Sequence, residues 1–209
     1  MIAGASGLVG DRVLELLLQD HRYGQVHALV RKPLAVVHRK LVQHPVNFDA
    51  LDGFDWPAVD DVFCCLGTTI KIAGSQAAFR KVDYTYVLSI AEHSLRAGAR
   101  RFLMVTAMGA NPRSSVFYSR TKGEIEQAVS ALPFKSVALF RPSFIGGERL
   151  QQRRGEGLAL TVFKQFDLLI PRKYKVISDA AIARAMIDTA QQPASGVRII
   201  ESDQLQAFA

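Results

Sequence analysis

Apolar residues along this chain follow two patterns that alternate over most of its length. Short apolar runs are typical of buried strands, whereas apolar residues that recur every three or four positions mark the buried face of a helix. The predicted strands are residues 26–30, 42–48, 61–67, 101–105, 197–200 and a segment that ends at Arg141. The predicted helical faces are residues 9–17, 87–95, 125–129, 158–166 and 182–189. This alternation predicts an α/β protein with a parallel sheet between two layers of helices.

The first junction between a strand and a helix contains three evenly spaced glycines. Directly after Ile2-Ala3, the chain reads Gly4-Ala5-Ser6-Gly7-Leu8-Val9-Gly10. In such a turn the first glycine permits the bend, the second lets the backbone approach a pyrophosphate, and the third lets the helix pack closely. The N–H groups of the first helical turn then face an anion. The predicted dinucleotide-binding residues here are Gly4, Ser6, Gly7, Leu8, Val9 and Gly10.

The opening strand is short for this role. Only Met1, Ile2 and Ala3 precede the first glycine, whereas strands usually run about 5–6 residues. We therefore expect that a few residues are missing ahead of Met1.

Two basic residues follow the second predicted strand. Arg31 and Lys32 stand about where a fold that binds NAD carries an acidic residue for the ribose 2′-hydroxyl. A guanidinium suits a phosphate instead. We interpret these residues as a site for a 2′-phosphate, which favours NADP(H) over NAD(H); the alternative is an ordinary pair of loop cations.

Further candidates follow the third and fourth predicted strands. Phe48 and Asp49 could flank an adenine, and the carboxyl ends of parallel strands line the ligand crevice. The residues expected there after the fourth strand are Cys65, Leu66, Gly67 and Thr68. Redox chemistry at Cys64 and Cys65 is an alternative, but buried strand cysteines are usually inert.

Tyr118 and Lys122 form the candidate catalytic pair. They lie four residues apart, so on a helix both project from one face. The pKa of a free tyrosine is about 10, and a nearby ammonium favours the phenolate, which makes the phenol a better acid–base group. The same ammonium could hold the ribose of a nicotinamide cofactor. Thr106, at the end of its strand, could hydrogen-bond a substrate carbonyl.

Composition and charge restrict the partners. The 209 residues are 49% hydrophobic and 22% charged, as in ordinary globular proteins, and carry a net charge of +7. The basic residues fall in short groups without a nucleic-acid recognition motif, so we expect a phosphate-bearing cofactor rather than nucleic acid. We expect neither a membrane span nor a secretory signal, and the histidine spacing predicts no metal. Two adjacent cysteines fit a reducing, cytoplasmic setting.

The glycine turn and Tyr-x-x-x-Lys resemble the short-chain dehydrogenase/reductase superfamily. Arg141-Pro142-Ser143-Phe144-Ile145 resembles a segment of its extended and atypical members. Residues 63–69, 82–87 and 117–124 are similar to the atypical branch named for a Tat-interacting oxidoreductase, and Cys-Cys-Leu-Gly-Thr-Thr is the most specific of these stretches. The likeness runs from Gly4 to about Glu201.

This resemblance implies a single three-layer Rossmann domain over residues 1–209, in which residues 146–195 form a small C-terminal extension on the substrate side. It implies that Tyr118 donates a proton, that Lys122 activates it and binds ribose, and that the cofactor is NADPH. Further cofactor contacts are expected from Arg141, Pro142, Phe144, Ile145 and Arg153. The chain departs from the superfamily in two places: Thr106 or Ala107 replaces the catalytic serine, and Asp83 replaces an asparagine of the proton relay.

Three functions are therefore compatible with the sequence. The first is an oxidoreductase that transfers hydride to or from a carbonyl or alcohol substrate. The second is a non-catalytic NADPH sensor that binds protein partners through its basic surface. The third, a nucleic-acid-binding module, is the least favoured. The substrate is expected to be a small molecule, and the protein a monomer or homodimer. A mobile basic loop is expected at residues 149–157.

Overall fold

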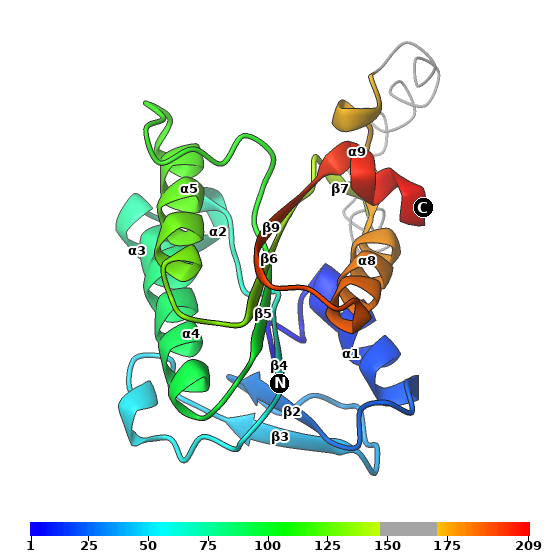
Figure 1. The fold of residues 1–209 in the computed structure, drawn as a ribbon. Helices are drawn as coiled ribbons and strands as arrows, with labels where there is room; N and C mark the ends of the chain where they lie inside the picture. The colour runs from blue at the N-terminus through cyan, green and yellow to red at the C-terminus, as the bar shows by residue number, and fades with distance from the viewer. Residues whose placement is uncertain (147–170) are drawn as a thin grey trace.

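The fold is a parallel sheet between two layers of helices. The computed structural model describes residues 1–146 and 171–209. The sheet has the strand order β3-β2-β1-β4-β5-β6-β9, and every neighbouring pair in it is parallel. In Figure 1 the sheet runs between α3, α4 and α5 on one side and α1 and α8 on the other. The predicted three-layer Rossmann architecture is confirmed.

The strands agree with the apolar runs, with shorter ends in two places. Their bounds are β1 (Ile2–Ala3), β2 (Val26–Val30), β3 (Leu41–Pro45), β4 (Asp61–Cys64), β5 (Arg101–Val105), β6 (Ser136–Arg141) and β9 (Gly196–Glu201). The edge strand β3 ends at Pro45, although the Val46 N–H still donates to the carbonyl of Val30 at 2.9 Å. β4 ends at Cys64, although the Cys65 N–H still donates to the carbonyl of Ala3 at 2.9 Å.

The helices cover the two faces unequally. The sheet face with α1 (Leu8–Gln19) and α8 (Asp179–Gln191) is opposite the face with the remaining long helices. On that face lie α2 (Ile70–Ala73), α3 (Gln76–Arg80), the π-helix η2 (Lys81–Tyr86), α4 (Val87–Arg96) and α5 (Phe117–Ser130). The shorter elements are η1 (Leu51–Gly53), β7 (Ile145–Gly146), η3 (Arg172–Tyr174), β8 (Ile177–Ser178), α9 (Ser202–Leu205) and η4 (Gln206–Phe208).

Each face of the sheet has its own hydrophobic core. Val13, Leu14 and Leu17 of α1 pack with Ile182 and Met186 of α8 on one face. On the other, Ile90 of α4 and Ile125 and Val129 of α5 pack over Val62 and Phe102. The residues predicted from the α-helical period are therefore the ones that these helices bury. Ser178 caps α8: its hydroxyl accepts a hydrogen bond from the Ala181 N–H at 3.1 Å.

The order in which strands are added to the sheet reverses at β1, which pairs with β2 on one side and with β4 on the other. In open parallel sheets a ligand crevice forms at such a switch point, outside the carboxyl ends of the strands. Gly4, Arg31, Cys65, Thr106 and Pro142 each follow a strand at this carboxyl edge. The expectations for residues 149–157, for the helix at 158–166 and for Arg153 fall outside the described residues.

Candidate cofactor and active site

The glycine turn has the close contacts that its spacing predicted. Gly4 has a φ of +84°, and an added Cβ would lie 2.5 Å from the backbone carbonyl group of Cys65. A Cβ on Gly10 would lie 2.1 Å from the Gly4 carbonyl oxygen. Both positions therefore require glycine: the first joins the turns after β1 and β4, and the second lets α1 start directly on the turn.

Gly7 is different, because it is exposed and a Cβ on it would meet a single tight contact. Among the described residues, and apart from its neighbours in the chain, that contact is the Gly4 carbonyl oxygen at 3.3 Å. Gly7 is also the N-cap of α1 and has no side chain to accept the amides of the first turn. An exposed helix start whose cap has no side chain to accept its amides is a suitable site for a pyrophosphate. The turn therefore fits a dinucleotide cofactor.

Lys122 reaches the same edge of the sheet from α5. Its ammonium Nζ lies 3.6 Å from the Cβ position of Gly67, in the turn after β4. Lys122 is only 5% exposed. A side chain on Gly67 would therefore crowd Lys122 and, at 3.2 Å from its Cβ position, the Asp83 carboxylate.

Asp83 of the π-helix η2 is the counterion of Lys122. Its Oδ1 is 2.7 Å from Nζ, and its Oδ2 accepts a hydrogen bond from the Thr68 N–H at 2.9 Å. The sequence marked Asp83 only as a departure from a family pattern and did not reveal this ion pair. The sequence carries no specific signal for the pair, beyond the general rule that a buried carboxylate needs a partner.

The ion pair opposes the effect of burial on both members. Burial acts against the charge of Lys122, but the Asp83 carboxylate and the Tyr118 phenol outweigh it and raise the pKa of Lys122. Burial also raises the pKa of the Asp83 carboxyl, and the donors on Lys122 and Thr68 offset part of that effect. Lys122 is therefore an ammonium at neutral pH.

Tyr118 lies one helical turn before Lys122 and is half-buried. Its ring packs against Phe79 of α3, with the ring centroids 5.3 Å apart. Both residues lie in α5 (Phe117–Ser130), four positions apart, so their side chains are neighbours on the helix surface. The structure thus brings the candidate catalytic pair together on one face of α5.

Arg31 and Lys32 are exposed directly after β2. They stand at the carboxyl edge, next to the glycine turn after β1, because β1 and β2 are hydrogen-bonded neighbours. Their role as a site for a 2′-phosphate stays a prediction.

The two cysteines have different neighbours, and neither is reactive at neutral pH. Burial raises the pKa of Cys64 to about 11 and raises that of Cys65 further. The Cys65 thiol contacts the sulfur of Met186 in α8 at 3.9 Å, so its side chain faces the core and only its backbone meets Gly4. Leu66, which follows, is half-buried against the opposite core.

Two expected site residues belong to a structural ion network. The Thr106 hydroxyl donates to Glu126 Oε1 at 2.5 Å, and the Arg141 guanidinium donates to Glu126 and, at 2.9 Å, to Glu201. The expectation that Thr106 holds a substrate carbonyl and that Arg141 binds the cofactor is corrected by these contacts. Glu126 lies one turn beyond Lys122 and its carboxylate is buried. The Thr106 hydroxyl and the Arg141 guanidinium that donate to it therefore point toward the interior.

Phe48 and Asp49 also differ from the expected adenine site. Phe48 is buried in the core beside Tyr86, with the ring centroids 5.6 Å apart, so it offers no open stacking surface. Asp49 accepts from the Tyr86 hydroxyl at 2.7 Å and pairs with Lys81 at 2.7 Å. These contacts fasten the loop after β3 to the π-helix.

The turn after β6 has mixed character. Pro142 is buried and its carbonyl accepts from the Met108 N–H at 2.9 Å, whereas Phe144 is 74% exposed. Ile145 pairs with Ile177 in the small β7–β8 sheet. Phe144 and Ile145 therefore lie at the carboxyl edge. Their contact with a cofactor stays a prediction.

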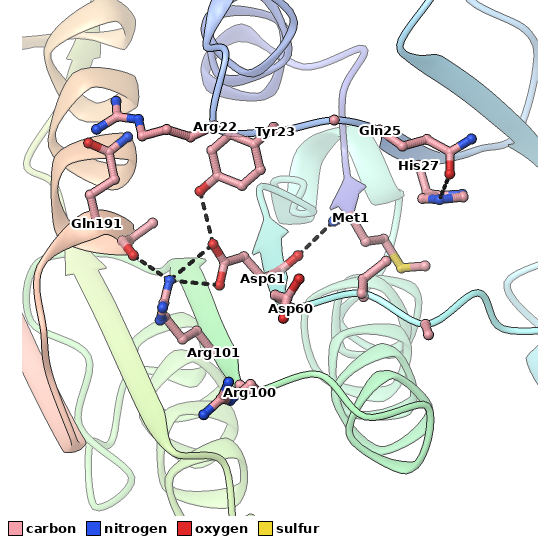
Figure 2. A pocket seen from close by; sticks show the side chains of 14 residues that line it. Met1, Arg22, Tyr23, Gln25, His27, Asp60, Asp61, Arg100, Arg101 and Gln191 are labelled. Atoms are coloured by element: carbon pink, nitrogen blue, oxygen red, sulfur yellow. Dashed lines mark hydrogen bonds and ion pairs between the residues drawn. The ribbon is translucent and has the colours of Figure 1, made fainter.

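A depression of about 540 Å³ lies at the opposite edge of the sheet. It is drawn in Figure 2, where Tyr23 and Arg101 converge on Asp61 at the start of β4. Because this edge carries the amino ends of the strands, the depression is separate from the glycine turn and from Lys122. It is not the predicted cofactor crevice.

Comparison with known proteins agrees with this geometry. Residues 4–132 match the family model described as NAD(P)H-binding. Protein HTATIP2 of Rattus norvegicus is 34% identical over 201 residues, which cover 93% of this chain and 82% of that protein. The mitochondrial FMP52 protein of Debaryomyces hansenii is 29% identical over 205 residues, with 92% and 87% covered.

Solved structures support the fold at lower identity. MoeE5 in complex with UDP-glucuronic acid and NAD has a TM-score of 0.72 at 16% identity, with 95% of this chain and 74% of that chain covered. UDP-glucose 4-epimerase of Thermotoga maritima, solved with UDP-glucose, has a TM-score of 0.69 at 16% identity, with 99% and 79% covered. The family match and the 34% identity with HTATIP2 show that the chain belongs to the NAD(P)H-binding family, within the branch of atypical short-chain dehydrogenase/reductase proteins that includes HTATIP2 and FMP52.

Proposed function

We propose that this protein is an NADPH-dependent oxidoreductase that interconverts a carbonyl and an alcohol. The observation that carries the proposal is the position of Lys122, whose ammonium lies 3.6 Å from the Cβ position of Gly67 at the carboxyl edge that also holds the glycine turn. A dinucleotide held at Gly7 and extended along this edge would bring its reactive end to Tyr118 and Lys122. The substrate is a small molecule of this carbonyl or alcohol class.

Each residue has a distinct part in the proposed reaction. NADPH, when bound, supplies the hydride. Tyr118 gives the proton to the carbonyl oxygen in reduction and takes it back in oxidation. Lys122 favours the phenolate of Tyr118 electrostatically and binds the ribose hydroxyls. Because Thr106 donates to Glu126, Tyr118 is left as the group that orients the carbonyl.

Arg31 selects the cofactor in this proposal. Arg31→Ala is expected to weaken NADPH binding roughly 10- to 100-fold and to change NADH binding by less than about threefold, because charge-assisted hydrogen bonds to a phosphate contribute about 1.5–3 kcal/mol. Nucleotide fluorescence titration measures both affinities. Arg96→Ala is the matched control, since it removes the same charge from an exposed site at the end of α4, toward the amino edge.

Equal loss of NADPH and NADH affinity in Arg31→Ala would argue against a 2′-phosphate site. A loss of the same size in Arg96→Ala would attribute the effect to net charge alone. Either result would contradict the assignment of NADPH as the preferred cofactor.

One observation favours a second function, a non-catalytic NADPH-binding regulator. The Thr106 hydroxyl, which stands in the place of a catalytic serine hydroxyl, is bound to Glu126 in the interior. A regulator of this kind would bind NADPH tightly, turn over no member of a broad carbonyl panel, and change its affinity for a partner protein when NADPH is added. Turnover of any panel member that is abolished in Tyr118→Phe decides for the enzyme.

The proposed compartment is a reducing one, and we propose the cytoplasm. Both Cys64 and Cys65 are free thiols, whereas the FMP52 relatives are named as mitochondrial proteins. Across residues 1–146 and 171–209, no helix has both the length and the apolar character needed to cross a membrane.

A further inference from the structure

The connection between β2 and β3 differs from the other crossovers of the sheet because it contains no helix. β2 and β3 are parallel, so the chain has to return from the carboxyl edge to the amino edge before β3 begins at Leu41. Such a return usually contains an α-helix. Here it is an irregular loop of residues 31–40, called the β2–β3 loop below, beside the edge strand of the sheet.

The β2–β3 loop has a defined shape because contacts on both sides of its tip hold it. The Gln43 side chain of β3 accepts from the Leu34 N–H at 2.6 Å and donates to the Val36 carbonyl at 3.1 Å. The side chain of Leu34 packs against the core that α1 covers. Beyond the tip, the Lys40 ammonium donates to the Asp20 carbonyl at 2.7 Å.

This anchored loop presents two adjacent valines to solvent. Val37 is 95% exposed and Val36 is 40% exposed, although Leu34 just before them packs inward. Single exposed apolar side chains are ordinary on a protein surface. Two neighbouring valines at the tip of a loop that is held in place form an apolar surface that folding leaves uncovered.

The loop also lies in a stretch with charges of one sign. Residues 21–48 contain five lysines and arginines and no aspartate or glutamate. The four in the loop are Arg31, Lys32, Arg39 and Lys40. The acidic residue before this stretch, Asp20, pairs with Arg22 at 2.8 Å. The acidic residue after it, Asp49, pairs with Lys81 at 2.7 Å. The apolar tip is therefore flanked by positive charge on both sides, which calls for an anionic partner.

The spacing of the cations indicates the kind of partner. Arg31 and Lys32 follow β2 at the carboxyl edge, whereas Arg39 and Lys40 precede β3 at the amino edge. The two ends of a five-residue strand are about 15 Å apart, so one phosphate group is too small to contact both pairs. A bilayer with anionic headgroups is wide enough, and its interface also accepts an apolar tip.

We propose that the β2–β3 loop docks this protein on the surface of an anionic phospholipid bilayer. Val36 and Val37 enter the interface, and the cations on both sides of them contact the headgroups. The proposal goes beyond the proposed function and does not rest on it, because neither valine nor Arg39 belongs to the proposed cofactor and active site. Docking of this kind is a reversible contact with the membrane surface and needs no helix that crosses the membrane.

The test is flotation of the whole protein, without cofactor, on vesicles of phosphatidylcholine with and without phosphatidylserine. Binding is expected to require phosphatidylserine and to weaken as the salt concentration rises. Val37→Asp is expected to lower the vesicle affinity about 10-fold or more, because an apolar contact is replaced by a charge that the headgroups repel. Arg39→Gln is expected to lower it about fivefold, through the loss of one cation.

Two matched controls make the same changes elsewhere. Val197→Asp alters a valine that is 47% exposed in β9, at the opposite end of the sheet. Arg96→Gln removes a cation from an exposed site at the end of α4. Both are expected to bind vesicles as the wild type does. Fluorescence titration is expected to show an unchanged NADPH affinity in Val37→Asp. Arg31 and Lys32 are left intact, because they also form the predicted phosphate site.

Absence of binding to phosphatidylserine vesicles at low salt would overturn the proposal, as would equal binding to vesicles without this lipid. Equal losses in Val37→Asp and Val197→Asp, or in Arg39→Gln and Arg96→Gln, would also overturn it. Poly-L-glutamate binding that Val37→Asp weakens as much as vesicle binding would point to an acidic protein instead, against the proposal. None of the vesicle measurements needs cofactor or turnover, so failure here is distinguishable from failure of the proposed function.

Discussion

Replacing Tyr118 with phenylalanine is expected to lower kcat by about 10²- to 10⁴-fold and to change the NADPH affinity by less than about twofold. The range is that of a lost general acid–base group. Phenylalanine keeps the ring that packs on Phe79, so the helix and the Lys122–Asp83 pair should persist. Steady-state oxidation of NADPH with a carbonyl substrate measures kcat, and fluorescence titration measures binding.

The matched control removes a different phenol hydroxyl. Tyr23 donates to Asp61 at 2.9 Å at the amino edge of the sheet, far from the glycine turn. Tyr23→Phe is expected to lower the stability by about 1 kcal/mol and to leave kcat unchanged. A Tyr118→Phe protein that retained the full rate would contradict the catalytic assignment of Tyr118.

Two glycines of the same turn are expected to fail in different ways when they are substituted. Gly10→Ala should lower the free energy of unfolding by about 3 kcal/mol or more, because its Cβ would lie 2.1 Å from the Gly4 carbonyl oxygen and the backbone must move. Gly7→Val should lower the free energy of unfolding by less, about 1 kcal/mol, because its Cβ would lie 3.3 Å from the Gly4 carbonyl oxygen, a tight contact that a small shift relieves, and its φ of −83° suits any residue.

Gly7→Val, the variant with the smaller loss of stability, should show the larger loss of NADPH affinity. Gly7→Val fills the space above the helix start, and we expect it to weaken NADPH binding by about 100-fold or more, the loss of about 3 kcal/mol of contacts to a charged group. Urea denaturation and fluorescence titration on the two variants give both quantities. A Gly7→Val protein that bound NADPH normally would show that the pyrophosphate lies elsewhere.

Local sequence signals predicted the parts of the molecule that depend on neighbours along the chain. The glycine spacing predicted the turn after β1, and a four-residue interval predicted that Tyr118 and Lys122 share one face of α5. Apolar periodicity predicted the alternation of strands and helices, because in this fold each element buries one or both of its faces locally. Element ends were less well predicted at β3 and β4, which end at Pro45 and Cys64, three residues before the predicted ends.

Contacts between distant elements could not be predicted in the same way. The Arg141–Glu126–Glu201 network joins β6, α5 and the end of β9, and nothing in the spacing of these residues indicates that they meet. Thr106 was assigned to the substrate because it ends a strand at the right edge, yet its hydroxyl turns toward Glu126. The Asp83–Lys122 pair depends on a π-turn, which has no clear sequence signature.

A crystal structure of the protein with NADPH tests the central claim most directly. The account predicts the pyrophosphate over Gly7, the 2′-phosphate at Arg31, and the nicotinamide ribose within hydrogen-bond distance of Lys122 beside Tyr118. A dinucleotide bound instead in the amino-edge depression beside Tyr23 and Asp61, or with its nicotinamide end remote from Tyr118, would contradict it.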